Sequence, residues 1–430
     1  MTQETLKYLE CIRCGRMLGD GAYHAGCPDC AARGKPSNWK TTYDLEIARP
    51  AFETSTLAGK SWGMWRYDAL LPFSAGQAVT LGEGGTPLIS APRLAKYLGL
   101  RTLWVKDESR NPTWAFKDRS MSVGATHALH LGNPAVVVSS TGNAAAATAA
   151  YSRRAGLPVI VFFARGVDSI MSAFVRSYGA LVVSTPSKPE RWTMVRHCVE
   201  KWGCYPAGNY LAPPIGLNPF MVDGYKTIGF EIWEQLGRRA PEWIFTPVGE
   251  SNCIYGIYKS FQELSQMGYA ESPRLGAAEI YGSLTRAIQE NDDAPRASVI
   301  ERGTVAFSIA TAQNTYHGFV SVQASNGMVA QVADDEILKA QKLLVENEGI
   351  FAEATSATSL AALIRGLETR TVSRDAEAVI LITSCGLKSL NVTSPKDEVP
   401  MVNHIDELSL VLKERYGFSP QIRAESIQET

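Results

Sequence analysis

The segment that decides the fold of this 430-residue chain is Asn111-Pro-Thr-Trp-Ala-Phe-Lys-Asp-Arg-Ser-Met121, followed by Ser139-Ser-Thr-Gly-Asn143. Lys117 lies directly after a phenylalanine, and an apolar setting lowers the pKa of a lysine so that it can form an imine with a carbonyl group. The second run favours a turn that opens a helix, where free backbone N–H groups bind anions. The two segments together predict a lysine that carries a cofactor beside a site for an anionic group.

The bulk composition is that of an ordinary soluble globular protein. The chain has 42 basic and 43 acidic side chains, a formal net charge of -1 and 45% hydrophobic residues. Such a balance offers no general electrostatic field for nucleic acid or an anionic membrane. No apolar stretch approaches the roughly 18 residues that span a bilayer, and the first residues lack the apolar core of a signal peptide. We therefore predict a cytoplasmic protein of two or more lobes.

Two CxxC pairs in the first 30 residues predict a metal site. Their ligands are Cys11, Cys14, Cys27 and Cys30. Two such knuckles present four thiolates tetrahedrally to Zn²⁺, and a site closed by four protein ligands is structural and not catalytic. The alternatives are free thiols in a flexible arm, or a redox pair. We expect His24 at the surface and not among the ligands. Only Arg13 and Arg16 are basic between the first and last cysteine, which argues against nucleic-acid binding.

Strand and helix patterns alternate from about residue 77 onward. Strands are predicted at 103–106, 135–139, 158–163, 180–184, 243–246 and 378–382, and helices at 144–154, from about 255, and at 334–347. This rhythm implies parallel strands joined by right-handed crossovers. The predicted fold class is α/β, a two-lobe protein with open, mostly parallel sheets and a small N-terminal zinc-ribbon segment. The residues from about 419 are polar and are predicted to be disordered.

Five segments in the same order resemble threonine synthase and its relatives among the fold-type II pyridoxal phosphate (PLP) enzymes. They are LGEGGTPL at 81–88, the lysine segment at 111–121, STGN at 140–143, DGYKT at 223–227 and TSCGLK at 383–388. Some members of that family also carry an N-terminal zinc ribbon. The resemblance implies a homodimer and a division into a zinc ribbon (1–35), a large lobe (36–125 and 231–400), a small mobile lobe (126–230) and a C-terminal tail (401–430).

The resemblance also implies roles for individual residues. Lys117 would form the Schiff base with PLP and move the substrate's Cα and Cβ protons. Asn143 would hydrogen-bond the 3′-oxygen of the ring, and Ser140, Thr141 and the N–H groups of Gly142 and Asn143 would bind the substrate carboxylate. Thr383 would face the ring nitrogen. A hydroxyl group cannot enforce protonation of that nitrogen, which favours elimination and replacement at Cβ or Cγ.

The loop expected to hold the PLP phosphate departs from the family pattern. Such a loop is normally rich in glycine, so that successive N–H groups converge on the anion. This chain has Pro247-Val-Gly-Glu-Ser-Asn-Cys253. Gly249 keeps the pattern, and Ser251 and Asn252 can still donate hydrogen bonds. Glu250 would repel a phosphate unless its side chain points outward.

Further departures concern the substrate pocket. Trp114 and Ala115 replace small residues beside the lysine, and we expect the tryptophan to narrow the pocket. Cys385 stands where relatives often have histidine, and Val167 where they often have lysine. Arg165 could compensate for that lost charge, although a surface arginine is the simpler interpretation.

The sequence thus predicts a PLP-dependent lyase or synthase that acts on an amino acid with a β or γ leaving group. The family's own reaction converts O-phosphohomoserine and water to threonine and phosphate. Alternatives are β-replacement on O-phosphoserine or another activated serine, as in cysteate synthase, and a threonine or serine dehydratase. A non-enzyme alternative is a degenerate binding module whose cofactor loop has eroded. The expected partner is a small amino-acid substrate, with no nucleic acid and no membrane.

Overall fold

The computed structural model describes residues 3–19, 23–56, 62–164, 169–186, 188–389, 402 and 405–417. The chain forms two compact units, Met1–Val392 and Thr393–Thr430. All the strands that the structure describes lie in the first unit, and in the second the structure describes one helix, α15 (Ile405–Tyr416). No helix in the described part of the chain is both long and apolar enough to cross a bilayer. The polar tail predicted from residue 419 lies outside the described residues.

The larger sheet has six strands in the order β11-β10-β9-β12-β4-β3. All neighbours pair in parallel except β3, which is antiparallel to β4. The strands are β3 (Leu88–Ser90), β4 (Thr102–Asp107), β9 (Trp243–Pro247), β10 (Arg274–Glu279), β11 (Met328–Gln331) and β12 (Glu377–Ile382). This confirms the mostly parallel sheet that the alternating pattern predicts.

Helices cover both faces of this sheet, and the central strand β12 shows why. Val379 and Leu381 pack into one hydrophobic cluster with α8 (Pro219–Gln235) and α9 (Asn252–Gln266). Ile380 and Ile382 point to the opposite face, into a second cluster with α12 (Asp334–Glu348) and α13 (Ala354–Glu368). Because successive side chains of a strand alternate between faces, a strand buried on both sides is apolar throughout.

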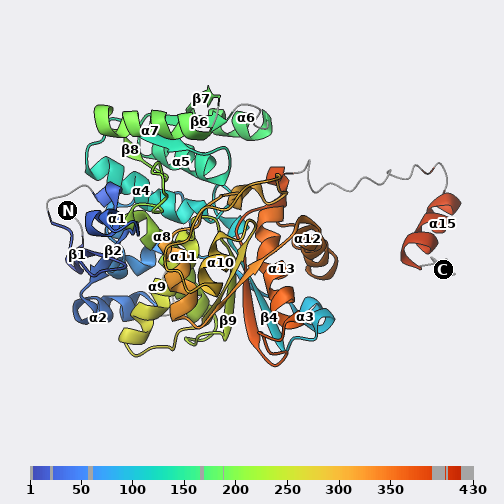
Figure 1. Cartoon of the computed structure of the whole chain (residues 1–430). Helices are drawn as coiled ribbons and strands as arrows, with labels where there is room; N and C mark the ends of the chain where they lie inside the picture. The colour runs from blue at the N-terminus through green and yellow to red at the C-terminus, as the bar shows by residue number, and fades with distance from the viewer. Residues whose placement is uncertain are drawn as a thin grey trace, which may run out of the picture. The chain divides into compact units, whose positions relative to one another are not determined.

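A second sheet of four parallel strands has the order β7-β6-β5-β8. Figure 1 shows it in green with α5, α6 and α7 beside it. Its elements are α4 (Lys117–His130), β5 (Val136–Ser139), α5 (Asn143–Arg154), β6 (Val159–Ala164), α6 (Ser169–Ser177), β7 (Leu181–Thr185), α7 (Lys188–Trp202) and β8 (Tyr205–Pro206). Helix α5 ends before Gly156, whose φ of 74° suits a glycine after a helix end.

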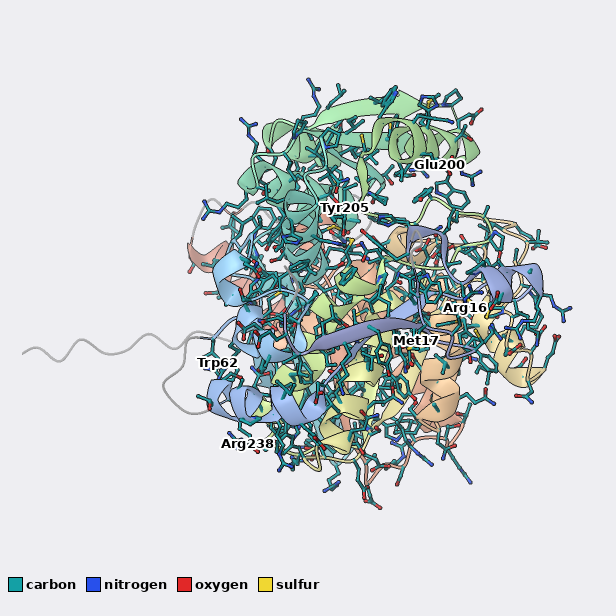
Figure 2. The ribbon with its side chains drawn as sticks, turned by 90° about the vertical axis from the view of Figure 1, so that its left-hand side faces the viewer. Arg16, Met17, Trp62, Glu200, Tyr205 and Arg238 are labelled. Atoms are coloured by element: carbon teal, nitrogen blue, oxygen red, sulfur yellow. The ribbon has the colours of Figure 1, made fainter. Side chains whose placement is uncertain are left out.

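The N-terminal segment forms a two-stranded antiparallel sheet of β1 (Leu6–Cys11) and β2 (Trp39–Tyr43), with α1 (Pro28–Ala32) between them and α2 (Leu45–Ser55) after them. Thr41 and Tyr43 of β2 donate hydrogen bonds to the buried carboxylate of Asp223, at 2.5 and 2.6 Å. His24 is half-buried, and its ring lies 4.0 Å from that of Tyr23 and 5.9 Å from that of Tyr205, which Figure 2 labels. His24 is therefore only partly exposed, and it is not among the four cysteines that cluster as candidate metal ligands, as predicted.

The remaining helices are α3 (Pro92–Leu98), α10 (Ser283–Gln289) and α11 (Tyr316–Ala324). The lobe boundaries implied by the family resemblance stay a prediction.

Candidate active site

The predicted cofactor and substrate residues meet at one cavity of about 270 Å³. Its lining includes Lys117, Ser140, Thr141, Gly142, Asn143, Gly249, Ser251, Asn252 and Thr383. The Ser140–Asn143 turn follows β5, the Gly249–Asn252 loop follows β9, and Thr383 follows β12. Ligands of open α/β sheets bind outside the carboxyl ends of the strands, and all three segments lie there.

Lys117 begins helix α4 and has an aromatic environment. Its Nζ lies 4.6 Å from the ring centre of Phe116 and 5.6 Å from that of Tyr225. Burial lowers the pKa of Lys117 below its ordinary value of 10.5. Within the described residues Nζ has no hydrogen bond or ion pair, so a lysine that is easily made neutral is free to react at the cavity.

Asn143 opens helix α5 and is held by two charged side chains. Its Nδ2 donates to Glu353 at 2.8 Å, and its Oδ1 accepts from Lys388 at 2.8 Å. Glu353 also accepts a hydrogen bond from Ser308 at 2.7 Å. Burial lowers the pKa of Lys388 to about 8. Sequence reasoning assigned no role to Lys388 or Glu353, although Lys388 ends the TSCGLK motif.

The first turn of α5 leaves backbone donors for an anion. In the described part of the chain, the N–H groups of Asn143 and Ala144 make no hydrogen bond, and the first helical bond is the one from Ala145 to Gly142. Ser140 Oγ accepts from the Gly142 N–H at 3.3 Å. This is the arrangement expected of a carboxylate site at a helix N-terminus.

The loop before α9 lines the cavity, but two of its side chains are engaged elsewhere. Ser251, whose φ is 59°, donates to Asn314 at 2.6 Å, and Asn252 Oδ1 accepts from the Leu217 N–H at 2.8 Å. The prediction that the Ser251 hydroxyl donates to a phosphate is therefore corrected, whereas Asn252 uses only its side-chain oxygen in this contact, so donation by its amide N–H groups stays a prediction. Among the described contacts, the backbone N–H groups of Asn252, Cys253 and Ile254 have no partner, so they are available to donate to an anion.

Thr383 connects the end of β12 to the lysine segment. Its hydroxyl lies 2.8 Å from that of Ser356, and its carbonyl accepts a hydrogen bond from the Phe116 N–H at 2.9 Å. These contacts fix the position of Phe116, and hence of the lysine that follows it.

Trp114 does not narrow the cavity. It is 50% exposed, lies outside the cavity lining and stacks on Phe174 with ring centres 5.4 Å apart. The prediction that it reshapes the pocket is wrong, because a φ of 59° at Trp114 turns the side chain outward. Cys385 is also absent from the lining. Arg165 and Val167 lie outside the described residues.

A buried ionic network supports the lysine segment. Arg119, two residues after Lys117, bonds Glu108 through two 2.7 Å contacts and Glu231 through contacts of 2.7 and 2.8 Å. Lys106 donates to Glu231 at 2.6 Å. All four charged side chains are fully buried, and their charges cancel. The network joins the start of α4 to β4 and α8.

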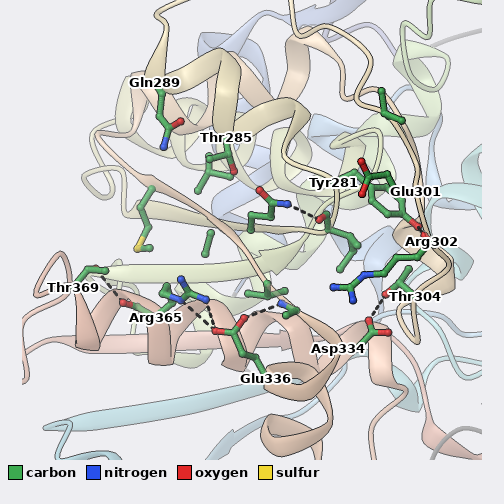
Figure 3. Close-up of a pocket in the computed structure, with 18 of the residues that line it drawn as sticks. Tyr281, Thr285, Gln289, Glu301, Arg302, Thr304, Asp334, Glu336, Arg365 and Thr369 are labelled. Atoms are coloured by element: carbon green, nitrogen blue, oxygen red, sulfur yellow. Dashed lines mark hydrogen bonds and ion pairs between the residues drawn. The ribbon is translucent and has the colours of Figure 1, made fainter.

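A larger cavity of about 850 Å³ lies elsewhere, between β11 and the start of α12. Figure 3 shows its Arg365 paired with Glu336, and Asp334 accepts a hydrogen bond from Thr304 at 2.6 Å. None of the predicted site residues lines it. Its described lining contains no lysine or cysteine, whereas Lys117 lines the smaller cavity.

The four N-terminal cysteines come together as predicted. Their sulfur atoms lie within 4.8 Å of one another, and the Cys11–Cys30 and Cys14–Cys27 separations are both 3.7 Å. Zn–S bonds of about 2.3 Å in a tetrahedron place sulfurs about 3.8 Å apart, so the cluster fits a zinc ion.

Comparison with known proteins identifies the class. Residues 79–384 match the family described as pyridoxal-phosphate dependent enzyme, and the chain belongs to it. The chain is therefore a PLP-dependent lyase or synthase, as the sequence predicts.

Curated relatives narrow the class to threonine synthase-like proteins. Threonine synthase of Methanocaldococcus jannaschii is 33% identical over 414 residues, 94% of this chain and 99% of that protein. Threonine synthase of Methanosarcina acetivorans is 34% identical over 402 residues, 92% of this chain and 95% of that protein.

Solved structures show the same fold at lower identity. Maize serine racemase has a TM-score of 0.62 and 21% identity, over 71% of this chain and 90% of that one. Threonine deaminase isoform 2 of Solanum lycopersicum has a TM-score of 0.61 and 21% identity, over 80% of this chain and 85% of that one.

Proposed function

We propose that this protein is a threonine synthase, which converts O-phosphohomoserine and water to threonine and phosphate. The choice of reaction is supported by threonine synthases that match nearly the whole chain at 33% and 34% identity. The observation that carries a catalytic role is the convergence of Lys117, the α5 N-terminus and Thr383 on one cavity.

The residues at this cavity fit PLP. Lys117 offers a free amine in an aromatic pocket, and the first turn of α9 offers unpaired N–H groups for the phosphate. Asn143 would bind the ring oxygen with its second amide hydrogen, and Thr383 would meet the ring nitrogen. When bound, PLP supplies an electron sink for negative charge that develops on the substrate.

Side chains and backbone groups of the protein would transfer protons and orient the substrate. Lys117, with its lowered pKa, takes and returns protons at the substrate's Cα and Cβ. The N–H groups at the start of α5, with Ser140 and Thr141, hold the substrate carboxylate and so orient the Cα–H bond toward the lysine. Closure of the small lobe, residues 126–230, over the bound substrate would keep bulk water away from the reactive intermediates.

We also propose that the cysteine cluster binds a structural zinc ion. Four thiolate ligands leave no open position for catalysis. Arg13, beside the cluster, stacks on Tyr316 at 3.8 Å and forms an ion pair with Asp293, so the ribbon is tied to the loop before α11. Assembly as a homodimer in the cytoplasm is part of the same proposal, and sedimentation would measure the oligomeric state.

Product analysis of the PLP-loaded protein tests the reaction. The panel is O-phosphohomoserine, O-phosphoserine, O-acetylserine, threonine and serine, with the Lys117→Ala variant as the inactive control. We expect threonine and phosphate in equal amounts from O-phosphohomoserine. Turnover of another amino acid without turnover of O-phosphohomoserine would contradict the proposal and favour β-replacement or dehydration.

A further inference from the structure

Arg191, on helix α7, is a buried cation without a counter-charge. It is 6% exposed and lines the same cavity as Lys117. Its Nε is buried without a hydrogen-bond partner. Among the ion pairs of the described residues, none involves Arg191, and Glu250, the acidic residue of the cavity lining, is not paired with it.

The fold brings Arg191 to the substrate side of the cavity. Helix α7 packs on β5 and β8, and Arg191 lies in its first turn. The carboxyl ends of those two strands lead into Ser139–Asn143 and Ala207–Asn209, which line the cavity as well. Arg191 therefore belongs to the four-stranded sheet with the α5 turn, whereas the α9 donors belong to the six-stranded sheet.

A buried guanidinium without a partner is costly, by several kcal/mol in typical proteins. An anion that enters the cavity would remove that cost, and the planar fork of arginine matches the paired oxygens of a phosphate or carboxylate. Burial alone lowers the pKa of Arg191 below its ordinary value, which agrees with the missing counter-charge.

Two anionic groups of the proposed reaction have candidate hydrogen-bond donors in the structure. The substrate's α-carboxylate has the start of α5, and the cofactor's phosphate has the start of α9. An anion on the substrate's side chain would need a further donor, and Arg191 is an unpaired cation among the described residues that line the cavity.

We propose that Arg191 binds the second anion of the substrate, so that the cavity selects amino acids whose side chain carries a phosphate or a similar anionic group. This inference rests on the proposed function, since it takes the cavity as the active site. Threonine and serine, whose side chains are neutral, leave Arg191 unpaired and are disfavoured substrates.

The test compares R191Q and R191K with R196Q, whose arginine is exposed on the same helix. On the PLP-loaded proteins we would measure kcat/KM for O-phosphohomoserine, the Kd of inorganic phosphate by calorimetry, and the melting temperature with and without phosphate. The Kd of PLP for the cofactor-free proteins is measured in parallel.

For R191Q we expect kcat/KM to fall, and the Kd of phosphate to rise, by about 30-fold or more, as is typical when one partner of a buried charge pair is removed. R191K should retain part of the kcat/KM and part of the phosphate affinity, because lysine keeps the positive charge but lacks the planar pair of N–H donors of the guanidinium group. PLP affinity should match R196Q, and the melting temperature without phosphate should be no lower than that of R196Q, because the substitution removes an unpaired buried charge.

Two results would overturn the inference. If R191Q binds phosphate as well as R196Q does, Arg191 is no anion site. If R191Q instead loses PLP affinity, Arg191 serves the cofactor's phosphate. Should no variant turn over O-phosphohomoserine, the proposed function fails, while the phosphate titration still decides the role of Arg191.

Discussion

Replacement of Arg119 by methionine removes the central cation of the buried ionic network that supports the lysine segment. The side chain forms four contacts of 2.7–2.8 Å to the carboxylates of Glu108 and Glu231. Without it, two buried carboxylates share one cation, Lys106. Removal of one partner from a buried ion network costs about 3–5 kcal/mol, because the remaining charge stays out of water. We expect R119M to lower the free energy of unfolding by that amount.

The matched control is R110M. Arg110 pairs with Asp107 at 2.9 Å, but its side chain is 66% exposed, and exposed pairs contribute about 1 kcal/mol or less. Urea unfolding followed by circular dichroism measures both variants, since urea does not screen charges as guanidinium does. If R119M is within about 1 kcal/mol of R110M, the buried network does not stabilise the lysine segment as argued.

Three further predictions concern other parts of the molecule. The double variant C11S/C14S should lose its bound zinc and melt at a lower temperature, whereas unchanged zinc content would contradict the ribbon site. Burial lowers the pKa of His127 and His317 from 6.5 to about 3, so their stabilising effect is complete above pH 6.5 and is lost as the pH falls. Each should cost about 2 kcal/mol of unfolding free energy between pH 6.5 and 5, and a flat profile in urea melts would refute this. Trp114→Ala should change KM for O-phosphohomoserine by about threefold or less, because the ring points away from the cavity. A larger change would indicate that Trp114 does shape the substrate pocket.

The strands that the sequence predicts are those with continuous apolar runs. Val136–Ser139 and Glu377–Ile382 are buried from end to end or nearly so, and such runs are visible without tertiary information. Strands β3 and β11 have only three and four residues and are partly exposed, which leaves no pattern to detect.

The site could be predicted only where a local motif carries it. Lys117 and Asn143 lie in such motifs, and the structure brings both to one cavity. The engagement of Ser251 with Asn314, 63 positions away, depends on tertiary packing and has no local signal. Arg191 has none either, because an arginine in an amphipathic helix is normally a surface residue, and only the packing of α7 on its sheet buries it.

Borohydride reduction of the purified, PLP-loaded protein, followed by peptide mass mapping, tests the central claim most directly. The protein should be yellow, and reduction should fix one phosphopyridoxyl group to Lys117. Lys388 is the informative competitor, because it is also buried, has a pKa lowered to about 8 and touches Asn143. A label on Lys388, or a colourless protein that gains no visible band with PLP, would contradict the assignment of this cavity.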